Sequence, residues 1–214
     1  MHLLQCCGRG DCNDGIVDFG ACAGGDPWGT WRYLTEHGVV TDRCKPYPDW
    51  VKWLGVNTFT DGGLDEEEEE AAVCRKQCTG NSSLDFEDEL YFGSSYDRLP
   101  VDEGTIRKEI FERGPVVTHL SVNDPLLDTH DHDDKVIYRC PADVGIATHG
   151  VRLIGWGEEE VVVNGSTSGQ TEKYWLAVNS WGRRWGNNGT FRIARGVNSC
   201  HVEEFVSTVQ IKKV

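Results

Sequence analysis

The sequence has little positive charge, no long apolar run and no recognisable signal peptide. Lys and Arg total 21 against 35 Asp and Glu, which gives a net charge of -14 at pH 7. This balance argues against binding to nucleic acid or to an anionic membrane surface, both of which attract basic patches. No segment approaches the roughly 18 apolar residues that a membrane span needs. Residues 1–5 run directly into cysteines without a charged start or an apolar stretch, so we expect that the natural N-terminus lies upstream.

Cysteine, in contrast, is abundant, with nine residues in the chain. This density is typical of a disulfide framework formed in an oxidising compartment. No Cys-x-x-Cys pair occurs, and adjacent Cys6 and Cys7 suit one tetrahedral site poorly, which argues against zinc. Three Asn-x-Ser/Thr sequons, at Asn81, Asn164 and Asn188, agree with secretion. The odd count leaves one cysteine to explain, as a nucleophile, a buried free thiol or half of a bridge whose partner lies elsewhere.

The order of predicted elements indicates an α+β fold. Residues 1–25 are interpreted as a disulfide-stapled loop, and helices are predicted after Asp26, ended by Gly38, and after Asp102, ended by Gly114. Residues 158–173 are polar and rich in Gly and Ser, so they are interpreted as a surface loop between two strands. Strand patterns occupy residues 116–122, 149–156, 174–179, 190–194 and 205–211, which predicts an antiparallel sheet or barrel.

Two strongly acidic segments, at residues 65–70 and 130–134, are candidates for a special role. Residues 65–70 are six consecutive acidic side chains, a pattern typical of a solvated stretch, although a specific role stays open. Residues 130–134 read His-Asp-His-Asp-Asp and could suggest a metal site, but a hydrated loop before a strand is favoured. We therefore predict neither a metal nor a cofactor.

A histidine and an asparagine stand at the edges of two predicted strands, at His149 and Asn179. An asparagine oxygen that accepts from one ring nitrogen fixes the tautomer and leaves the other nitrogen facing a nucleophile. Trp181 could cover that hydrogen bond and keep water from competing with it. Taken alone, however, the pair favours a core histidine and a turn asparagine.

The full motifs around this pair resemble the papain-like cysteine peptidases, and within them cathepsin B. The two main motifs are Thr-His-Gly-Val-Arg-Leu-Ile-Gly-Trp-Gly at residues 148–157 and Tyr-Trp-Leu-Ala-Val-Asn-Ser-Trp-Gly at residues 174–182. Further elements follow the family's order, at residues 3–8, 22–25, 44–47, 74–78, 114–116 and 195–196. The resemblance implies a two-lobe fold. Residues 1–98 would be the remainder of a helical, disulfide-rich left lobe with an occluding-loop-like insertion at 44–78, and residues 99–214 a right lobe built as an antiparallel β-barrel.

The resemblance also implies peptide-bond hydrolysis by a Cys–His–Asn mechanism. In it, His149 is the general base and acid, Asn179 orients it, and Trp181 shields the pair. The implied substrate-binding positions are Gly24, Gly25, Thr148, Gly150 and Phe205. Phe205 stands at the S2 floor where cathepsin B has Glu, which implies a preference for apolar over Arg P2 residues. Residues 44–74 contain no histidine and carry the acidic run, which implies an endopeptidase rather than a dipeptidyl carboxypeptidase.

The same resemblance implies the partners and the location of the protein. Peptide or protein substrates and cystatin-type inhibitors are the expected partners. The expected location is the secretory pathway, either lysosomal or extracellular.

Family-like pairing accounts for eight of the nine cysteines. The implied bridges are Cys6–Cys74, Cys7–Cys12, Cys44–Cys78 and Cys140–Cys200, with Cys22 left over. The family places its nucleophile in a Cys-Gly-Ser-Cys-Trp segment upstream of the Cys-Cys-Gly element, and no such segment occurs here. We therefore expect an N-terminally truncated chain, without the central nucleophile helix and inactive by itself. The alternative is a non-catalytic secreted or matrix binding protein of the same fold, similar to tubulointerstitial nephritis antigen, in which the nucleophile is replaced.

Overall fold

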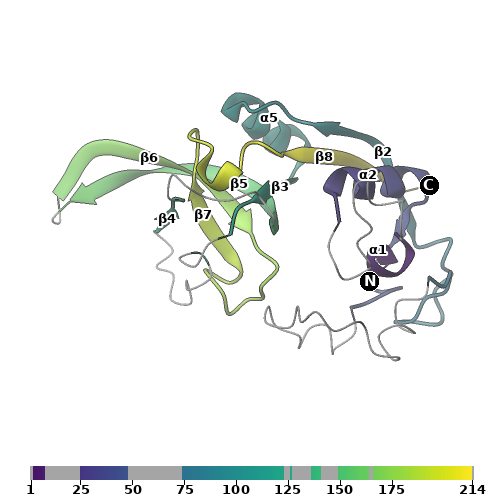
Figure 1. Cartoon of the computed structure of the whole chain (residues 1–214). Coiled ribbons are helices and arrows are strands. Elements are labelled where there is room, and N and C mark those ends of the chain that lie inside the picture. Colours follow the sequence, from purple (N-terminus) through teal and green to yellow (C-terminus); the bar gives the residue numbers. More distant parts are fainter. Residues whose placement is uncertain are drawn as a thin grey trace. The chain divides into compact units, whose positions relative to one another are not determined.

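The computed structural model describes residues 2–7, 25–47, 74–122, 126, 136–140, 149–163 and 166–213. The chain forms two compact units, of which unit 1 comprises Met1–Tyr96 with Val209–Val214 and unit 2 comprises Asp97–Thr208. It passes from one unit to the other within strand β2 (Leu90–Arg98) and again within strand β8 (Ser207–Lys213) (Figure 1). Assigning these units to the expected lobes, 1–98 and 99–214, stays a prediction.

Unit 1 contains helix α1 (His2–Cys6), helix α2 (Pro27–Glu36) and strand β1 (Val39–Val40). Helix α2 begins where the sequence predicts, because the Asp26 carboxylate accepts a hydrogen bond from the Gly29 N–H at 3.2 Å. The helix ends before Gly38, whose φ of +74° suits glycine. Strand β1 pairs antiparallel with β2, a pairing that the sequence pattern did not predict.

Helix α1 corrects the expectation that residues 1–25 form only a stapled loop. Tertiary contacts stabilise this short helix, since five residues are too few to be helical alone. The Val40 N–H donates to Nδ1 of the buried His2 ring at 3.0 Å, and the Cys6–Cys74 disulfide closes the other end. Residues 8–24 lie outside the described part of the chain.

Unit 2 is built on a sheet in which the strand order is β8-β3-β5-β6-β7-β4. The remaining strands are β3 (Val116–Leu120), β4 (Ile137–Tyr138), β5 (His149–Val163), β6 (Ser166–Val178) and β7 (Thr190–Ala194). The pairings β8–β3, β3–β5, β5–β6 and β6–β7 are antiparallel, whereas β4 runs parallel to β7. A short 3-10 helix, η1 (Ser199–His201), precedes β8.

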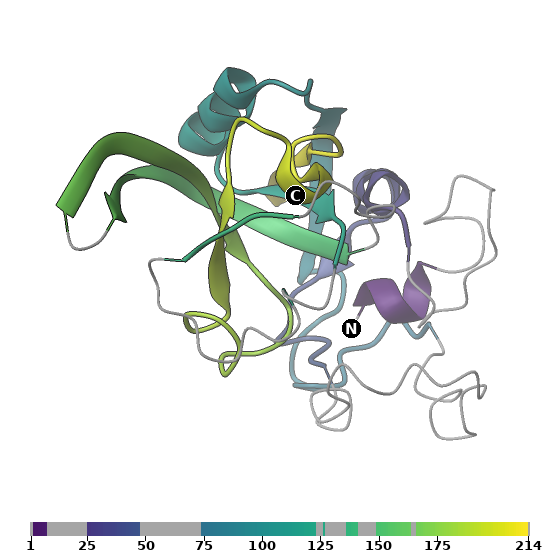
Figure 2. The same cartoon turned by 60° about the vertical axis from the view of Figure 1, so that its left-hand side comes forward.

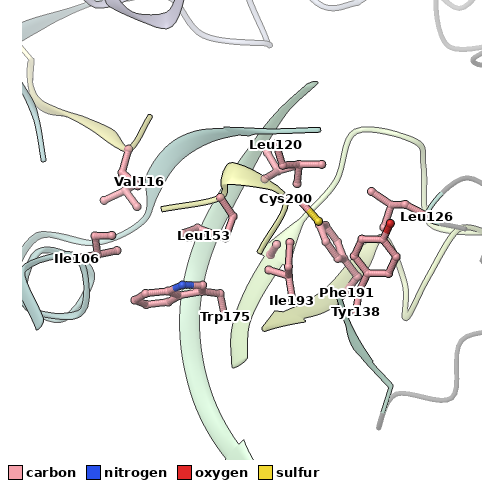
Figure 3. Close-up of a cluster of buried hydrophobic side chains, with 14 of the residues drawn as sticks. Ile106, Val116, Leu120, Leu126, Tyr138, Leu153, Trp175, Phe191, Ile193 and Cys200 are labelled. Carbon is pink, nitrogen blue, oxygen red and sulfur yellow. The ribbon is translucent and has the colours of Figure 1, made fainter. Parts of the chain in front are cut away.

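Helix α5 (Glu103–Arg113) covers the apolar face of this sheet and confirms the second predicted helix. Its N-cap is Asp102, whose carboxylate accepts from the Thr105 N–H at 2.6 Å. Ile106 from the helix, Val116 and Leu153 from two strands, and Trp175 from a third are fully buried (Figure 3). The core extends through Leu120, Leu126, Tyr138, Phe191, Ile193 and Cys200. This core fixes the sheet whose strand ends carry the candidate site.

The region 158–173, expected to be a surface loop, is instead the outer part of a β-hairpin. Strands β5 and β6 stay paired out to Val163↔Ser166, and the hairpin projects beyond β7 (Figures 1 and 2). Polar composition concealed the strands because their glutamates pair with arginines from elsewhere in the chain. Oε1 of Glu159 lies 2.5 Å from Nη1 of Arg192, and Oε1 of Glu172 lies 2.5 Å from Nη2 of Arg139.

Three disulfides implied by the resemblance are present, namely Cys6–Cys74, Cys44–Cys78 and Cys140–Cys200. Cys7 is also disulfide-bonded, while its expected partner Cys12 and the leftover Cys22 lie outside the described residues. The acidic run at 65–70 and most of the insertion at 44–78 lie outside them as well. Within the described ranges, no helix has the length and apolar content to cross a bilayer.

Candidate active site

The expected histidine and asparagine lie together at one end of the unit 2 sheet. His149 is the first residue of β5, and Asn179 directly follows the last residue of β6. The ring Nε2 of His149 lies 2.8 Å from Oδ1 of Asn179. An amide oxygen can only accept, so Nε2 carries the proton and the lone pair of the neutral ring is on Nδ1.

The orientation of the Asn179 side chain is fixed by a second donor. The Ser180 N–H donates to the same Oδ1 at 2.7 Å, so this atom is the oxygen rather than the amide nitrogen. Asn179 is buried, and its Nδ2 has no hydrogen-bond partner in the described part of the chain. The buried amide is thereby committed, through its oxygen, to the histidine.

Three aromatic rings pack one against the next, beginning at the His149 ring. The Trp181 ring lies 4.8 Å from the His149 ring at an interplanar angle of 34°, and so covers one face of the imidazole. Trp185 packs edge-on against Trp181 at 4.9 Å, and Phe191 packs edge-on against Trp185 at 5.2 Å. An apolar cover keeps water from competing for the Nε2–Oδ1 hydrogen bond and strengthens it.

The turn after β6 holds the asparagine through its backbone. The Asn179 N–H donates to the Gly189 oxygen at 2.9 Å, and the Gly189 N–H donates to the Trp185 oxygen at 2.8 Å. Gly189 has a φ of +85°, and a Cβ there would lie 3.2 Å from the Gly182 oxygen. A side chain at 189 would therefore be strained by the backbone conformation and would lie close to the Gly182 carbonyl.

Burial sets the charge state of the histidine. Desolvation lowers the pKa of the His149 imidazole below its ordinary value, and the hydrogen bond to Asn179 opposes part of that shift. The lowered pKa means that the ring is neutral near pH 7 and can accept a proton at Nδ1.

The other expected binding positions are distributed over both units. In unit 2, Gly150 is exposed beside His149, and Phe205 is 44% exposed. Gly25 is exposed in unit 1, and a Cβ added there would meet nothing within 4 Å. Gly24 and Thr148 lie outside the described residues.

His119, which the sequence interpretation did not single out, lies beside Gly150 and Phe205 in unit 2. It pairs with Gly150 across β3 and β5, and its ring lies 6.3 Å from that of Phe205. The residue types gave no clear signal, because Val-Val-Thr-His-Leu does not alternate strictly between apolar and polar. In the structure burial alternates along β3 and puts His119 on the face opposite the core. Its Cδ2 would lie 3.9 Å from a Cβ at Gly150.

Metal-ligand geometry is not found in the described ranges, where no group of three or more His, Cys, Asp and Glu side chains converges. The acidic segment 130–134 lies outside those ranges.

A strand-end imidazole that is oriented by an amide oxygen beneath an indole can exchange protons through its other ring nitrogen. The comparisons with known proteins give the family. Residues 1–210 match the model of the papain family of cysteine proteases. The chain belongs to that family, and cathepsin B-like proteases are among its relatives.

The chain is similar to several known proteins. Cathepsin B-like protease 1 from Arabidopsis thaliana is 33% identical over 204 residues, which cover 95% of this chain and 46% of the relative. A tubulointerstitial nephritis antigen-like protein from Rattus norvegicus is 33% identical and is matched over 86% of this chain and 39% of its own length. Procathepsin B S9 from Trypanosoma congolense has 28% identity and a TM-score of 0.66, with 99% of this chain and 59% of that structure covered. The chain thus spans less than half the length of these two curated relatives.

Proposed function

We propose that this chain supplies the histidine and the asparagine of a Cys–His–Asn cysteine peptidase, with His149 as general base and acid and Asn179 as its positioning residue. The observation that supports this is the 2.8 Å hydrogen bond from His149 Nε2 to Asn179 Oδ1, made beneath the Trp181 ring. It leaves Nδ1 as the nitrogen that exchanges protons with the reacting groups.

In the proposed mechanism, His149 Nδ1 takes the proton of a cysteine thiol and the thiolate attacks the peptide carbonyl carbon. The imidazolium returns its proton to the leaving amine as the C–N bond breaks, which leaves an acyl-enzyme thioester. Water then gives a proton to Nδ1 and attacks the thioester, and that proton returns to the leaving thiolate. Asn179 accepts from Nε2–H throughout and holds the ring in one orientation.

The nucleophile is proposed to belong to a segment outside residues 1–214. Papain-like peptidases carry a Cys-Gly-Ser-Cys-Trp element upstream of the segment that corresponds to adjacent Cys6 and Cys7. The sequence contains no such element. The chain by itself is then expected not to hydrolyse peptides.

The expected substrate preference follows from the site's surroundings. We propose that Phe205 forms the apolar floor of the S2 pocket and that Gly150 lies along the substrate backbone. The substrate-binding roles of Gly24, Gly25 and Thr148 stay predictions. Apolar P2 residues should be preferred over Arg, because an aromatic floor offers no carboxylate to pair with a guanidinium. Endopeptidase activity is proposed, since residues 44–74 contain no histidine to bind a C-terminal carboxylate.

Two assays test the proposal. The 214-residue chain should release no fluorophore from Phe-Arg or Arg-Arg substrates, and activity blocked by an epoxide inhibitor would contradict the external nucleophile. A chimera that joins residue 1 to the nucleophile-bearing segment of a cathepsin B-like relative should cleave Phe-Arg faster than Arg-Arg. In that chimera, His149→Ala should lower kcat/KM by about 10²–10⁴-fold, while His201→Ala, a change at a half-exposed histidine bonded to Glu204, should not.

A second candidate function is a non-catalytic secreted or matrix binding protein. The similarity to tubulointerstitial nephritis antigen-like relatives favours it. The residue at the nucleophile position of the native protein distinguishes the two, since Cys supports the peptidase and Ser the binding protein. Either function is proposed to operate in the secretory pathway, lysosomal or extracellular, with protein substrates and cystatin-type inhibitors as partners of the peptidase.

A further inference from the structure

The sequon at Asn81, in unit 1, has no part in the proposed peptidase chemistry. Its residues are exposed and are joined by hydrogen bonds. Asn81, Ser82 and Ser83 are all exposed, in the segment between Cys78 and the buried Phe86. Oδ1 of Asn81 accepts from the Ser83 N–H at 3.0 Å and from the Ser83 hydroxyl at 2.7 Å. A backbone N–H can only donate, so the atom that faces Ser83 is the oxygen and the amide nitrogen is the other end of the side chain.

We propose that Asn81 is an N-glycosylation site of this protein; the inference rests on the secretory-pathway location proposed above. The acceptor atom is Nδ2. It attacks the anomeric carbon of a lipid-linked oligosaccharide diphosphate, the bond from that carbon to the phosphate oxygen breaks, and the lipid diphosphate leaves with both electrons. Nδ2 gives up one of its two protons to a base and keeps the other.

The folded structure accommodates the product of this reaction. Glycosylation changes Nδ2 and leaves Oδ1 unchanged, so both hydrogen bonds to Ser83 survive. All three sequon residues are exposed, so the sugar extends into solvent without displacing a core side chain. Asn81 is thus accessible both before and after folding. Transfer of the oligosaccharide therefore does not compete with folding.

The sequon at Asn188 differs in its surroundings: Asn188 is exposed, but the middle residue of the sequon, Gly189, is buried. Its threonine, Thr190, is the first residue of β7 and donates its hydroxyl to the Asn187 oxygen at 2.7 Å rather than to Asn188. Asn188 has a φ of 53° within the turn that holds the Asn179 N–H through Gly189. This turn is closed by these backbone hydrogen bonds and by the β6–β7 pairing. We infer that Asn81, and not Asn188, carries the glycan.

Translation into endoplasmic-reticulum microsomes tests the inference. The 214-residue chain is given a heterologous signal peptide and a C-terminal tag with an established acceptor sequon, which reports import and transferase activity. The background is Asn164→Gln, because Asn164 lies outside the described residues. The readout is the number of glycans removed by endoglycosidase, with the position assigned by ¹⁸O labelling during peptide-N-glycosidase release.

We expect two glycans on this chain, one on the tag and one on Asn81. Asn81→Gln and Ser83→Ala should each leave only the tag glycan, whereas Ser83→Thr and the matched control Asn188→Gln should keep both. A tag glycan alone on the parent chain, or two glycans on Asn81→Gln, would overturn the inference. Either result would leave the peptidase proposal standing, because the microsomes import the chain whatever its native destination and the hydrolysis assays are separate.

Discussion

Arg195 offers the sharpest stability test, because its side chain is fully buried in unit 2 and carries a charge. Its guanidinium binds the Glu103 carboxylate of α5 and the Glu158 carboxylate of β5, the latter at 2.9 Å. It also donates to the backbone oxygens of Gly157 and Tyr174, each at 3.3 Å. One side chain therefore joins the helix to two strands of the sheet.

Arg195→Met keeps most of the side-chain length and removes the charge. Breaking a buried ion pair costs about 3–5 kcal/mol, largely because the remaining partner is left uncompensated. Here Glu103 keeps Arg107 at 3.3 Å and Lys173 at 3.7 Å, and the Glu158 side chain is 49% exposed. We therefore expect the lower end of that range, a loss of about 3 kcal/mol.

The assay is urea unfolding followed by tryptophan fluorescence, since the chain has eight tryptophans. Glu103→Gln should cost less, about 2 kcal/mol, because Arg195 keeps Glu158 and its backbone acceptors. The double variant should be less destabilised than the sum of the two single changes, which isolates the coupling between them. Arg183→Met, a change at an exposed arginine, is the control, with an effect within about 0.5 kcal/mol. A loss below about 1 kcal/mol for Arg195→Met would refute the reasoning.

Three further stability predictions follow from the same structure. Burial, Lys45 and the N-terminus lower the pKa of His2 to about 4. From pH 6.5 down to about 4 the unfolded chain binds more protons at His2, so about 1–2 kcal/mol of stability is lost over that interval after allowance for solvent screening. His2→Phe should flatten this pH dependence of urea unfolding, and an unchanged slope would contradict the prediction. Replacing Cys140 and Cys200 by Ser opens a loop with a sequence separation of 60 and should cost about 4 kcal/mol in thermal or urea unfolding. Asp102→Ala removes the α5 N-cap and should cost about 1 kcal/mol in the same assay, with Asn retaining most of it.

Local sequence patterns predicted the elements whose stabilising contacts are near in the chain. Helix α2 begins at its expected cap because Asp26 bonds to a residue three positions away. The outer β5–β6 hairpin was missed because its glutamates are neutralised by Arg139 and Arg192, which are distant in sequence. A polar pattern is indistinguishable from a loop until such partners are known.

The sequence motifs predicted the two main residues of the candidate site but not the contacts around them. The motifs around His149 and Asn179 placed the two residues at strand ends, and the structure brings them within hydrogen-bond distance. The second donor to Asn179, from the Ser180 N–H, depends on the turn geometry and could not be predicted from residue types. The proximity of His119 to Phe205 likewise depends on the register of β3 against β5 and on the position of the segment before β8.

The charge of His149 connects the structure to the proposed chemistry. Cysteine peptidase chemistry uses a thiolate beside an imidazolium, yet in this chain burial outweighs the Asn179 hydrogen bond and lowers the pKa of His149. A thiolate near Nδ1 would favour the protonated ring and raise that pKa. NMR titration of the His149 ring in the 214-residue chain should therefore give a pKa below 6.5, and Asn179→Ala should lower it further. In the chimera with the nucleophile segment the pKa should rise, and replacing that cysteine by Ala should reverse the rise. Equal His149 pKa values in the chain, in the chimera and in its alanine variant would show that this imidazole does not face the thiol, and His149 could not then be the base.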